Sequence, residues 1–355
     1  MSGEMWIALV DSADTVGITM TFFVNIILLG LLRTRGKHLG TYKYLMAFFS
    51  VFSMFYAIIE FILRPIMHIE NATFFLISRK RFDYSTQLGK INSAFYCACF
   101  ATSFVVSGVH FVYRYFASCK PCRLRFFSMP YILLWPLGCS ISVTMWASVS
   151  YFLYPDTDYT EEAVTNVLKI HYNWIRKENV SYIAYVYYQY DQYGVRYVYL
   201  KNLLGCFVHY YVMTMTFVVM FYCGYSTWKT MRKYKGISDR TRQLQKQLFK
   251  ALVLQVLELI MLLRELSEFQ TLVPSIFMYI PTGVMFIAPF FDVDLNANAN
   301  FIVFCSFLYP GLDPMILILI IRDFRDTLWK FVRGKQNHVD ESRSITRNFS
   351  QAIPS

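Results

Sequence analysis

One apolar stretch of the chain ends in a motif that combines an imidazole, two phenols and a guanidinium. It reads His110-Phe111-Val112-Tyr113-Arg114-Tyr115. The planar guanidinium of Arg114 carries five N–H donors, so it could hold neighbouring helices together and bind a partner protein when they separate. Alternatively, Arg114 extends its charge to the membrane surface among interfacial aromatic rings, without a signalling role. The position of the motif fits both interpretations.

A carboxylate stands between two prolines in the last apolar stretch, in Tyr309-Pro310-Gly311-Leu312-Asp313-Pro314. Proline has no backbone N–H, so each proline leaves an upstream carbonyl without its helical partner and favours a kink. A carboxylate is costly in lipid, so Asp313 should face the other helices. The motif is either a structural kink or a switch element that uses Asp313.

Other ionisable side chains are weaker candidates for chemistry. Glu60 and His209 lie within apolar stretches, where such a group belongs to a binding site or is hydrogen-bonded by a neighbouring Tyr or Ser. Cys119 and Cys122 have the spacing of a metal or redox pair, but no second pair accompanies them. No Ser-His-Asp arrangement, phosphate loop or HExxH motif occurs. We therefore expect no catalytic residues, no metal site and no cofactor.

These side chains must be positioned by helices that cross a membrane. Of the 355 residues, 56% are hydrophobic and only 16% are charged, well below the quarter that is usual for soluble proteins. The apolar stretches are about 20 residues long, enough at ~1.5 Å per residue to cross ~30 Å of hydrocarbon as helices. They are residues 15–32, 44–63, 91–112, 129–151, 203–225, 248–291 and 301–321. The sequence thus predicts an all-α membrane protein, a seven-transmembrane helix bundle.

Basic residues between the stretches predict the orientation of this bundle. When alternate loops are assigned to one face, 23 Lys and Arg residues lie on the face of the C-terminal tail and 10 lie on the other. Positive charge concentrates on the cytosolic side of membrane proteins, so the C-terminus should be cytosolic and the N-terminus extracellular. The net charge of +11 therefore reflects contact with the lipid bilayer, and no nucleic-acid partner is expected.

Two N-glycosylation sequons agree with this orientation. Those at Asn71 and Asn179 both lie on the predicted extracellular face of what we expect to be a multi-pass plasma-membrane glycoprotein. After the last stretch, residues 322–331 have the aromatic and basic side chains of an amphipathic helix on the inner leaflet. Residues 1–335 should form the seven-transmembrane domain, and residues 336–355 a cytosolic tail.

Longer segments of the chain point to a known family. They are Met1-Ser2-Gly3-Glu4, residues 40–50 (GTYKYLMAFFS), residues 110–115, and Asn296-Ala297-Asn298-Ala299-Asn300 with residues 309–314. With them, nearly the whole chain resembles the nematode seven-transmembrane chemoreceptors of the Str (serpentine receptor) type. Residues 256–270 depart from the family pattern, in which Gln255 would run directly into Thr271. Their four charges are costly inside a membrane, so we interpret them as an insert in the sixth span.

The resemblance implies a G-protein-coupled odorant receptor for olfaction and chemotaxis, in the ciliary membrane of a chemosensory neuron. Its implied ligand is a small volatile ketone of the diketone class, such as diacetyl, and its partner is a heterotrimeric G protein. The residues expected to serve activation and G-protein coupling are His110, Tyr113, Arg114, Tyr115 and Asp313. The large outer loop, residues 152–201, has no cysteine to join it to the third span. We expect its tyrosine-rich segment, residues 182–199, to hold it in place.

Depth along the helices predicts where the ligand binds. His110 lies about 28 Å below Ile91 at the outer end of the third span, too deep for an odorant, so it should tune activation. A diketone has only acceptor atoms, so Tyr or His donors within an aromatic lining should contact it. The predicted ligand-binding residues are Tyr96, Phe100, His209, Tyr210, Tyr279 and Phe304. Ordinary helix packing is the alternative for each of them.

An odorant-gated ion-channel subunit is the leading alternative, because such proteins of the insect type also have seven spans. Their N-terminus is inside, opposite to the orientation that the basic residues predict here. A transporter is disfavoured because the chain shows no internal repeat. The location of the N-terminus therefore separates the two main hypotheses.

Overall fold

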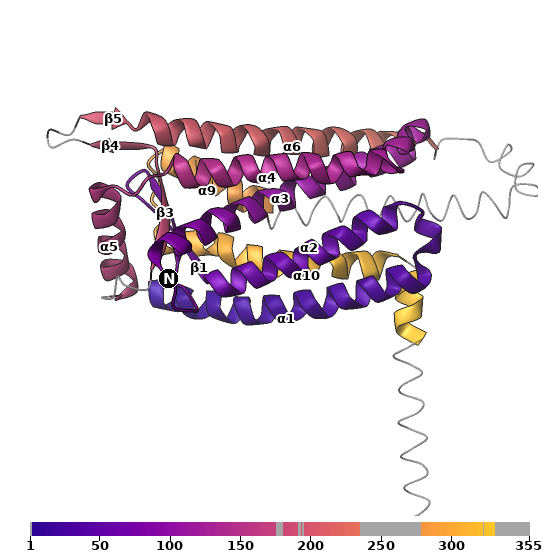
Figure 1. Ribbon diagram of the computed structural model, residues 1–355, viewed down its shortest axis with the longest axis horizontal. Helices are drawn as coiled ribbons and strands as arrows, with labels where there is room; N and C mark the ends of the chain where they lie inside the picture. Colours follow the sequence, from indigo (N-terminus) through magenta and orange to yellow (C-terminus); the bar gives the residue numbers. More distant parts are fainter. Residues whose placement is uncertain are drawn as a thin grey trace, which may run out of the picture.

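Long helices lie side by side in an elongated bundle (Figure 1). The computed structural model describes residues 2–174, 180–190, 193, 195–234, 278–321 and 323–330. Six helices in these ranges are long and apolar enough to span a membrane. They are α1 (Gly3–Arg35), α2 (Tyr42–Leu63), α3 (Thr86–Cys119), α4 (Leu134–Phe152), α6 (Leu200–Tyr234) and α10 (Asn300–Ile320). The predicted helical membrane protein is confirmed.

The sixth predicted span is only partly described. Its described part is the short apolar helix α9 (Ile280–Phe290). The proposed insert, residues 256–270, lies outside the described residues. Short 3₁₀ helices occur elsewhere, namely η1 (Gly36–Leu39), η2 (Pro121–Phe127), η3 (Tyr131–Leu133) and η5 (Ala297–Ala299).

A small β-structure covers one end of the bundle, which the sequence did not predict. Strands β1 (Pro65–Glu70), β2 (Thr73–Ser78) and β3 (Ser181–Val186) form an antiparallel sheet in the order β1-β2-β3. Asn71 and Ala72 both have positive φ, as a two-residue hairpin turn requires. Beside the sheet lie α5 (Asp158–Tyr172) and the hairpin of β4 (Tyr188–Tyr190) and β5 (Arg196–Val198). The tyrosine-rich segment thus holds the outer loop through strand pairing.

The chain termini of the described part lie at opposite ends of the bundle (Figure 1). The N-terminus lies beside α5 and the sheet, at what we call the sheet end. Residues 323–330 are helical, as predicted, and turn away from the bundle axis at the other end, which we call the tail end. Phe324 of this segment is buried against Leu317 and Ile321, while Asp323 and Arg325 are exposed.

The asparagines of residues 296–300 cover the free edge of β1. The backbone N–H of Asn296 donates to the Ile69 carbonyl at 2.8 Å. The side-chain oxygen of Asn300 accepts from the Met67 N–H at 3.0 Å. Asn298 accepts from the indole N–H of Trp6 at 3.0 Å, which adds α1 to the contact. An uncovered strand edge would leave backbone groups unpaired, so this segment completes the sheet.

Helices α1 and α10 approach closely around the two prolines of α10. Pro314 has no N–H for the carbonyl of Pro310, one helical turn earlier. The side-chain amide of the buried Asn25 donates to this carbonyl at 3.1 Å and replaces the missing bond. A Cβ atom on Gly17 would lie 2.4 Å from the Phe307 carbonyl oxygen, so only glycine permits this approach.

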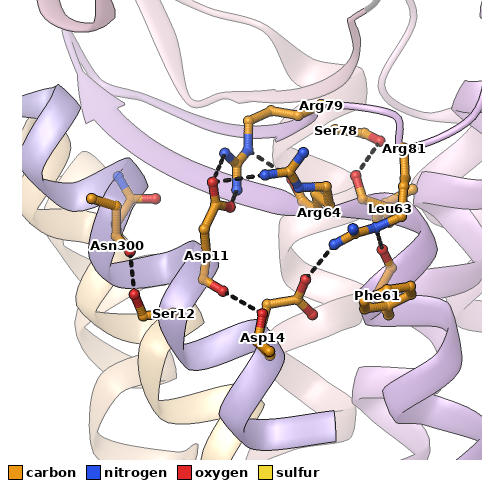
Figure 2. Close-up of polar contacts among 12 residues, drawn as sticks. Asp11, Ser12, Asp14, Phe61, Leu63, Arg64, Ser78, Arg79, Arg81 and Asn300 are labelled. Carbon is orange, nitrogen blue, oxygen red and sulfur yellow. Dashed lines mark hydrogen bonds and ion pairs between the residues drawn. The ribbon is translucent and has the colours of Figure 1, made fainter.

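Helix α1 begins at Gly3, well before the predicted Thr15, because the carboxylates of Asp11 and Asp14 are paired (Figure 2). Ser2 caps the helix by accepting from the Met5 N–H. Asp11 accepts from Arg64 at 2.7 Å and from Arg79 at 2.5 and 3.2 Å. Asp14 accepts from Arg81 at 2.9 Å. We call these five residues, Asp11, Asp14, Arg64, Arg79 and Arg81, the ion cluster.

The ion cluster predicts a stability effect that can be measured. Asp11→Asn should lower the free energy of unfolding by at least about 2 kcal/mol, because it leaves the Arg79 side chain, which is 4% exposed, without its anion. Thermal unfolding of the purified protein in detergent measures the change. Asp156→Asn is the matched control, since Asp156 pairs with Lys90 but is 52% exposed, so the loss should stay below about 1 kcal/mol. Equal effects of both substitutions would contradict the prediction.

Candidate functional site

The most unusual polar side chain in the bundle is His209 on α6. It is fully buried, and its ring stacks on that of Trp146 of α4 with centroids 4.1 Å apart. Neither ring nitrogen has a hydrogen-bond partner in the described part of the chain. The structural interpretation of His209, a hydrogen bond with a neighbouring Tyr or Ser, is therefore not observed among the described residues. A buried polar group without a partner costs about 1–3 kcal/mol, so each one needs an explanation, and a bound ligand would supply it for His209.

Aromatic rings from three other segments of the chain also surround this histidine. Tyr154, which follows α4, has its ring centroid 5.9 Å from that of His209, and Tyr185 of β3 lies at 6.0 Å. Phe286 of α9 lies at 6.4 Å from His209 and 5.4 Å from Tyr210. We call His209, Trp146, Tyr154, Tyr185, Tyr210 and Phe286 the His209 cluster. Residues of the outer loop thus contribute directly to it.

The predicted ligand-binding residues lie at four separate places in the structure. His209 and Tyr210 belong to the His209 cluster. Phe100 and Tyr279 both contact Phe104, with ring centroids 5.1 and 4.7 Å from it. Tyr96 instead stacks on Tyr56 of α2 at 5.8 Å.

Phe304 contacts Phe301 of its own helix, with centroids 6.4 Å apart. The sequence therefore predicted His209 and Tyr210 together but missed Trp146, Tyr185 and Phe286. Nothing in the spacing of these three residues, from three separate segments, indicates that they meet.

Arg114 is buried, 3% exposed, so the interpretation of a side chain that reaches the membrane surface is wrong. Its guanidinium donates twice to the hydroxyl of Tyr42 on α2, at 2.8 and 3.2 Å. Nδ1 of His110 lies 3.3 Å from the same hydroxyl. One phenol therefore joins both ionisable residues of the motif to α2.

Asp313 lies beside this group. His110, Arg114, Tyr309 and Asp313 line one cavity of about 10 Å³, close to the volume of a single water. The hydroxyls of Ser107 and Tyr309 lie 3.3 Å apart at this cavity. The structure thus brings together Arg114, His110 and Asp313, which the sequence proposed from separate motifs. We call Tyr42, His110, Arg114 and Asp313 the Arg114 cluster.

The two tyrosines that flank Arg114 contact different elements. Tyr113 stacks on Tyr42 with ring centroids 4.7 Å apart. Tyr115 packs against Tyr222 of α6 at 5.7 Å. The motif therefore links α3 to α2 on one side and to α6 on the other.

The remaining candidates have simpler explanations. Glu60 is buried and accepts a hydrogen bond from Ser306 of α10 at 3.1 Å. This agrees with the interpretation in which a neighbouring Tyr or Ser satisfies the carboxylate. All eight cysteines are free and six are buried, as expected for small hydrophobic side chains. Asn71 is exposed in the β1–β2 turn, and Asn179 lies outside the described residues. Use of either sequon stays a prediction.

One group in the described ranges has the donor atoms of a metal site, namely His68, Glu70 and His171 at the sheet end. Burial lowers the pKa of His68 to about 3, with a further contribution from the nearby His171 imidazole. The His68 imidazole is therefore neutral at physiological pH. Burial also raises the pKa of its neighbour Tyr172 to about 12. This group could not be predicted from the sequence, because His68 and His171 lie on elements far apart in the chain.

The chain matches a sequence model of one protein family over most of its length. That family is the Str family of serpentine type 7TM GPCR chemoreceptors, and the match covers residues 10–265 and 266–329. The chain belongs to this family. The resemblance inferred from its motifs is confirmed, and the two matched segments meet inside the proposed insert of residues 256–270.

Known Str receptors and related proteins show the same relationship. Serpentine receptor class r-10 of Caenorhabditis elegans is 79% identical over 352 residues, which cover 99% of both chains. The protein of the same name from Caenorhabditis briggsae is 77% identical over 353 residues, again 99% of both. The G-protein coupled receptor str-33 of C. elegans is 25% identical over 323 residues, 88% of both. By name, the first two relatives are serpentine receptors and the third is a G-protein coupled receptor, and none of the three is named as an enzyme.

From the Arg114 cluster of this Str receptor we predict that the hydroxyl of Tyr42 stabilises the folded protein. Tyr42→Phe should lower the free energy of unfolding by about 1.5–3 kcal/mol, because the buried guanidinium loses an acceptor. Thermal unfolding in detergent tests this. Tyr44→Phe, which removes a hydroxyl from an exposed ring of the same helix, should change little. A Tyr42→Phe protein as stable as the wild type would contradict the proposed role of the hydroxyl.

Proposed function

We propose that this chain is an odorant receptor that detects a small volatile ketone such as diacetyl and signals to a heterotrimeric G protein. The observation that carries the ligand part is the imidazole of His209, which is buried within aromatic rings and has no hydrogen-bond partner among the described residues. The family accounts for the receptor class, and the resemblance of the sequence motifs suggests the diketone. We expect the protein in the ciliary membrane of a chemosensory neuron.

The chemistry of the His209 cluster suits a diketone. A diketone offers two carbonyl acceptors and no donor, and a neutral imidazole has one N–H to donate. The apolar faces of Trp146 and Phe286 can cover the carbon skeleton of the ligand. Binding would give His209 the hydrogen bond that no described residue supplies.

The size of the ligand limits the energy available for binding. A volatile of about six non-hydrogen atoms gains at most ~9 kcal/mol at ~1.5 kcal/mol per atom, so sub-micromolar affinity is the limit. The site must therefore be small and closed. Tyr210, Phe100 and Tyr279 would extend its lining along α6, α3 and the start of α9. Tyr96 and Phe304 are the weakest members of the proposed set, because their rings contact Tyr56 and Phe301 instead.

The Arg114 cluster is the proposed activation element. It lies on α3, and Arg114 follows Phe100 by about 21 Å along the helix axis. Its contacts reach α2 through Tyr42 and α10 through Asp313. Freed from Tyr42, the guanidinium could bind the G protein at the tail end.

The distribution of unpaired positive charge supports a cytosolic tail end. At the sheet end, Arg64, Arg79, Arg81 and Lys90 each pair with a carboxylate. Basic residues of the tail end that form no ion pair with any described residue are Arg33, Arg35, Lys43, Arg123 and Arg125. The sheet end also has Lys80, Lys169, Arg196 and Lys201 without an ion pair to a described residue, but Asp156, Asp158, Glu161 and Glu162 lie at the same end. Net positive charge therefore lies at the tail end, the side that faces the cytosol in most membrane proteins.

This orientation predicts the location of the N-terminus. An antibody against an N-terminal tag should bind unpermeabilised cells that express the receptor, while a C-terminal tag should need permeabilisation. Staining of the N-terminal tag only after permeabilisation would contradict the orientation and favour the ion-channel subunit.

The proposed ligand site predicts a change in selectivity. His209→Phe should lower the potency of diacetyl by at least about tenfold, because a buried hydrogen bond to the ligand is lost. An apolar volatile of similar size should lose less, so the rank order of the odorants changes. The response of cells to a panel of volatiles, with and without a G-protein inhibitor, measures both claims.

Two matched variants make this test specific. Tyr211→Phe alters an exposed side chain of the same helix and should have no effect. His110→Phe should scale all responses together, because His110 belongs to the activation element. If His209→Phe reaches the surface and keeps the wild-type rank order, the ligand binds elsewhere. Responses that survive G-protein inhibition would contradict the signalling part.

A further inference from the structure

We propose that His68, Glu70 and His171 form a binding site for a transition-metal dication of the Zn²⁺ class at the sheet end. The site joins β1, which carries His68 and Glu70, to the last turn of α5, which carries His171. It is separate from the His209 and Arg114 clusters, so it does not depend on the proposed odorant or on G-protein coupling.

The distances between donor atoms fit a tetrahedral ion. Nε2 of His68 lies 3.2 Å from Oε2 of Glu70, and Nε2 of His171 lies 3.4 Å from the same oxygen. Two ligand atoms that are each about 2.1 Å from one ion at a tetrahedral angle lie about 3.4 Å apart. The donor atoms of all three residues lie within 4.8 Å of one another. Small side-chain rotations would therefore complete the coordination.

The other ring nitrogen of His68 contacts Tyr172, and this contact suits a metal-binding orientation of the imidazole. Its Nδ1 lies 3.4 Å from the hydroxyl oxygen of Tyr172, and that oxygen accepts from the amide of Asn300 at 2.9 Å. When Nδ1 carries the imidazole hydrogen and donates to Tyr172, Nε2 presents a lone pair toward Glu70. Metal-binding histidines are commonly oriented in this way through their other nitrogen.

In this tautomer a lone pair of His68 would lie opposite a carboxylate oxygen at 3.2 Å, whereas in the other tautomer Nε2 would donate to that oxygen. Two such acceptors repel each other unless a proton or a cation lies between them. A metal ion turns the repulsion into coordination and also uses the second imidazole, that of His171. The rings of the two histidines are already close, with centroids 4.7 Å apart.

The donor set selects the class of ion. Two imidazoles with one carboxylate suit Zn²⁺ and related transition metals, whereas Ca²⁺ and Mg²⁺ prefer oxygen ligands alone. The His171 and Glu70 side chains are 25% and 28% exposed, so an ion can enter from solvent. The fourth position is then open to water, as in sites with three protein ligands.

A bound ion would restrain the elements of the sheet end relative to one another. The C-terminus of α5 already packs against the start of α1, where a Cβ atom on Gly3 would lie 2.0 Å from the His171 carbonyl oxygen. Asn173 donates to Glu4 of α1 at 3.1 Å. A metal bridge from α5 to β1 would therefore restrain α1, α5 and the sheet together.

The test is a Zn²⁺ titration of the purified full-length receptor, prepared without a polyhistidine tag. Calorimetry should show one ion bound per chain, and Zn²⁺ should raise the thermal midpoint of unfolding. His171→Ala and Glu70→Gln should each lower the affinity by at least about tenfold and reduce the thermal shift. Mg²⁺ should give neither signal.

Glu162→Gln is the matched control, because it removes an exposed carboxylate from the same helix outside the site. It should bind Zn²⁺ like the wild type. His171 and Glu70 are both partly exposed, so at least one variant should fold, which its thermal midpoint without metal verifies. Absence of Zn²⁺ binding by the wild type, or equal affinity in the wild type and a folded site variant, would overturn the proposal.

Discussion

The bond between the Asp11 carboxylate and the guanidinium groups of Arg64 and Arg79 determines how the sheet sits on the helices. Arg64 ends α2 in a left-handed conformation, and Arg79 directly follows β2. Both reach the same carboxylate of α1. The β1–β2 hairpin is therefore held at both of its ends by one side chain. The positions of α5, β3 and the residue 296–300 segment follow, because each packs on or pairs with this hairpin.

Elsewhere in the bundle, polar side chains donate hydrogen bonds to buried acceptor groups that lipid cannot hydrogen-bond. Asn25 replaces the helical donor that Pro314 lacks, and Ser306 donates to the buried Glu60. His209 differs from Glu60, because it is fully buried among aromatic rings and both of its nitrogens, like the buried hydroxyls of Ser50 and Tyr96, have no described partner. That contrast is why we place the ligand at His209 and assign a structural role to Glu60.

The sequence predicted those features that depend on local composition. The long apolar stretches give the membrane helices, and the aromatic and basic residues after α10 give the helix of residues 323–330. The strands escaped prediction because Ile66, His68, Phe75 and Ile77 are buried together with the residues between them, so no alternation of polar and apolar side chains appears. The early start of α1 and the burial of Arg114 depend on partners more than 50 residues away. No local pattern contains that information.

The arrangement of α3 suggests how the two clusters communicate. A ligand shifts a conformational equilibrium only through contacts that differ between the two states. The His209 cluster contacts α4, α6 and α9, whereas the Arg114 cluster contacts α2 and α10. Helix α3 connects them, and it faces α6 closely, since a Cβ atom on Gly108 would lie 3.2 Å from the Thr216 methyl group. Because Tyr115 packs on Tyr222 of α6 while Tyr42 fixes Arg114 to α2, a displacement of α6 by ligand would move one side of the motif while α2 holds the other.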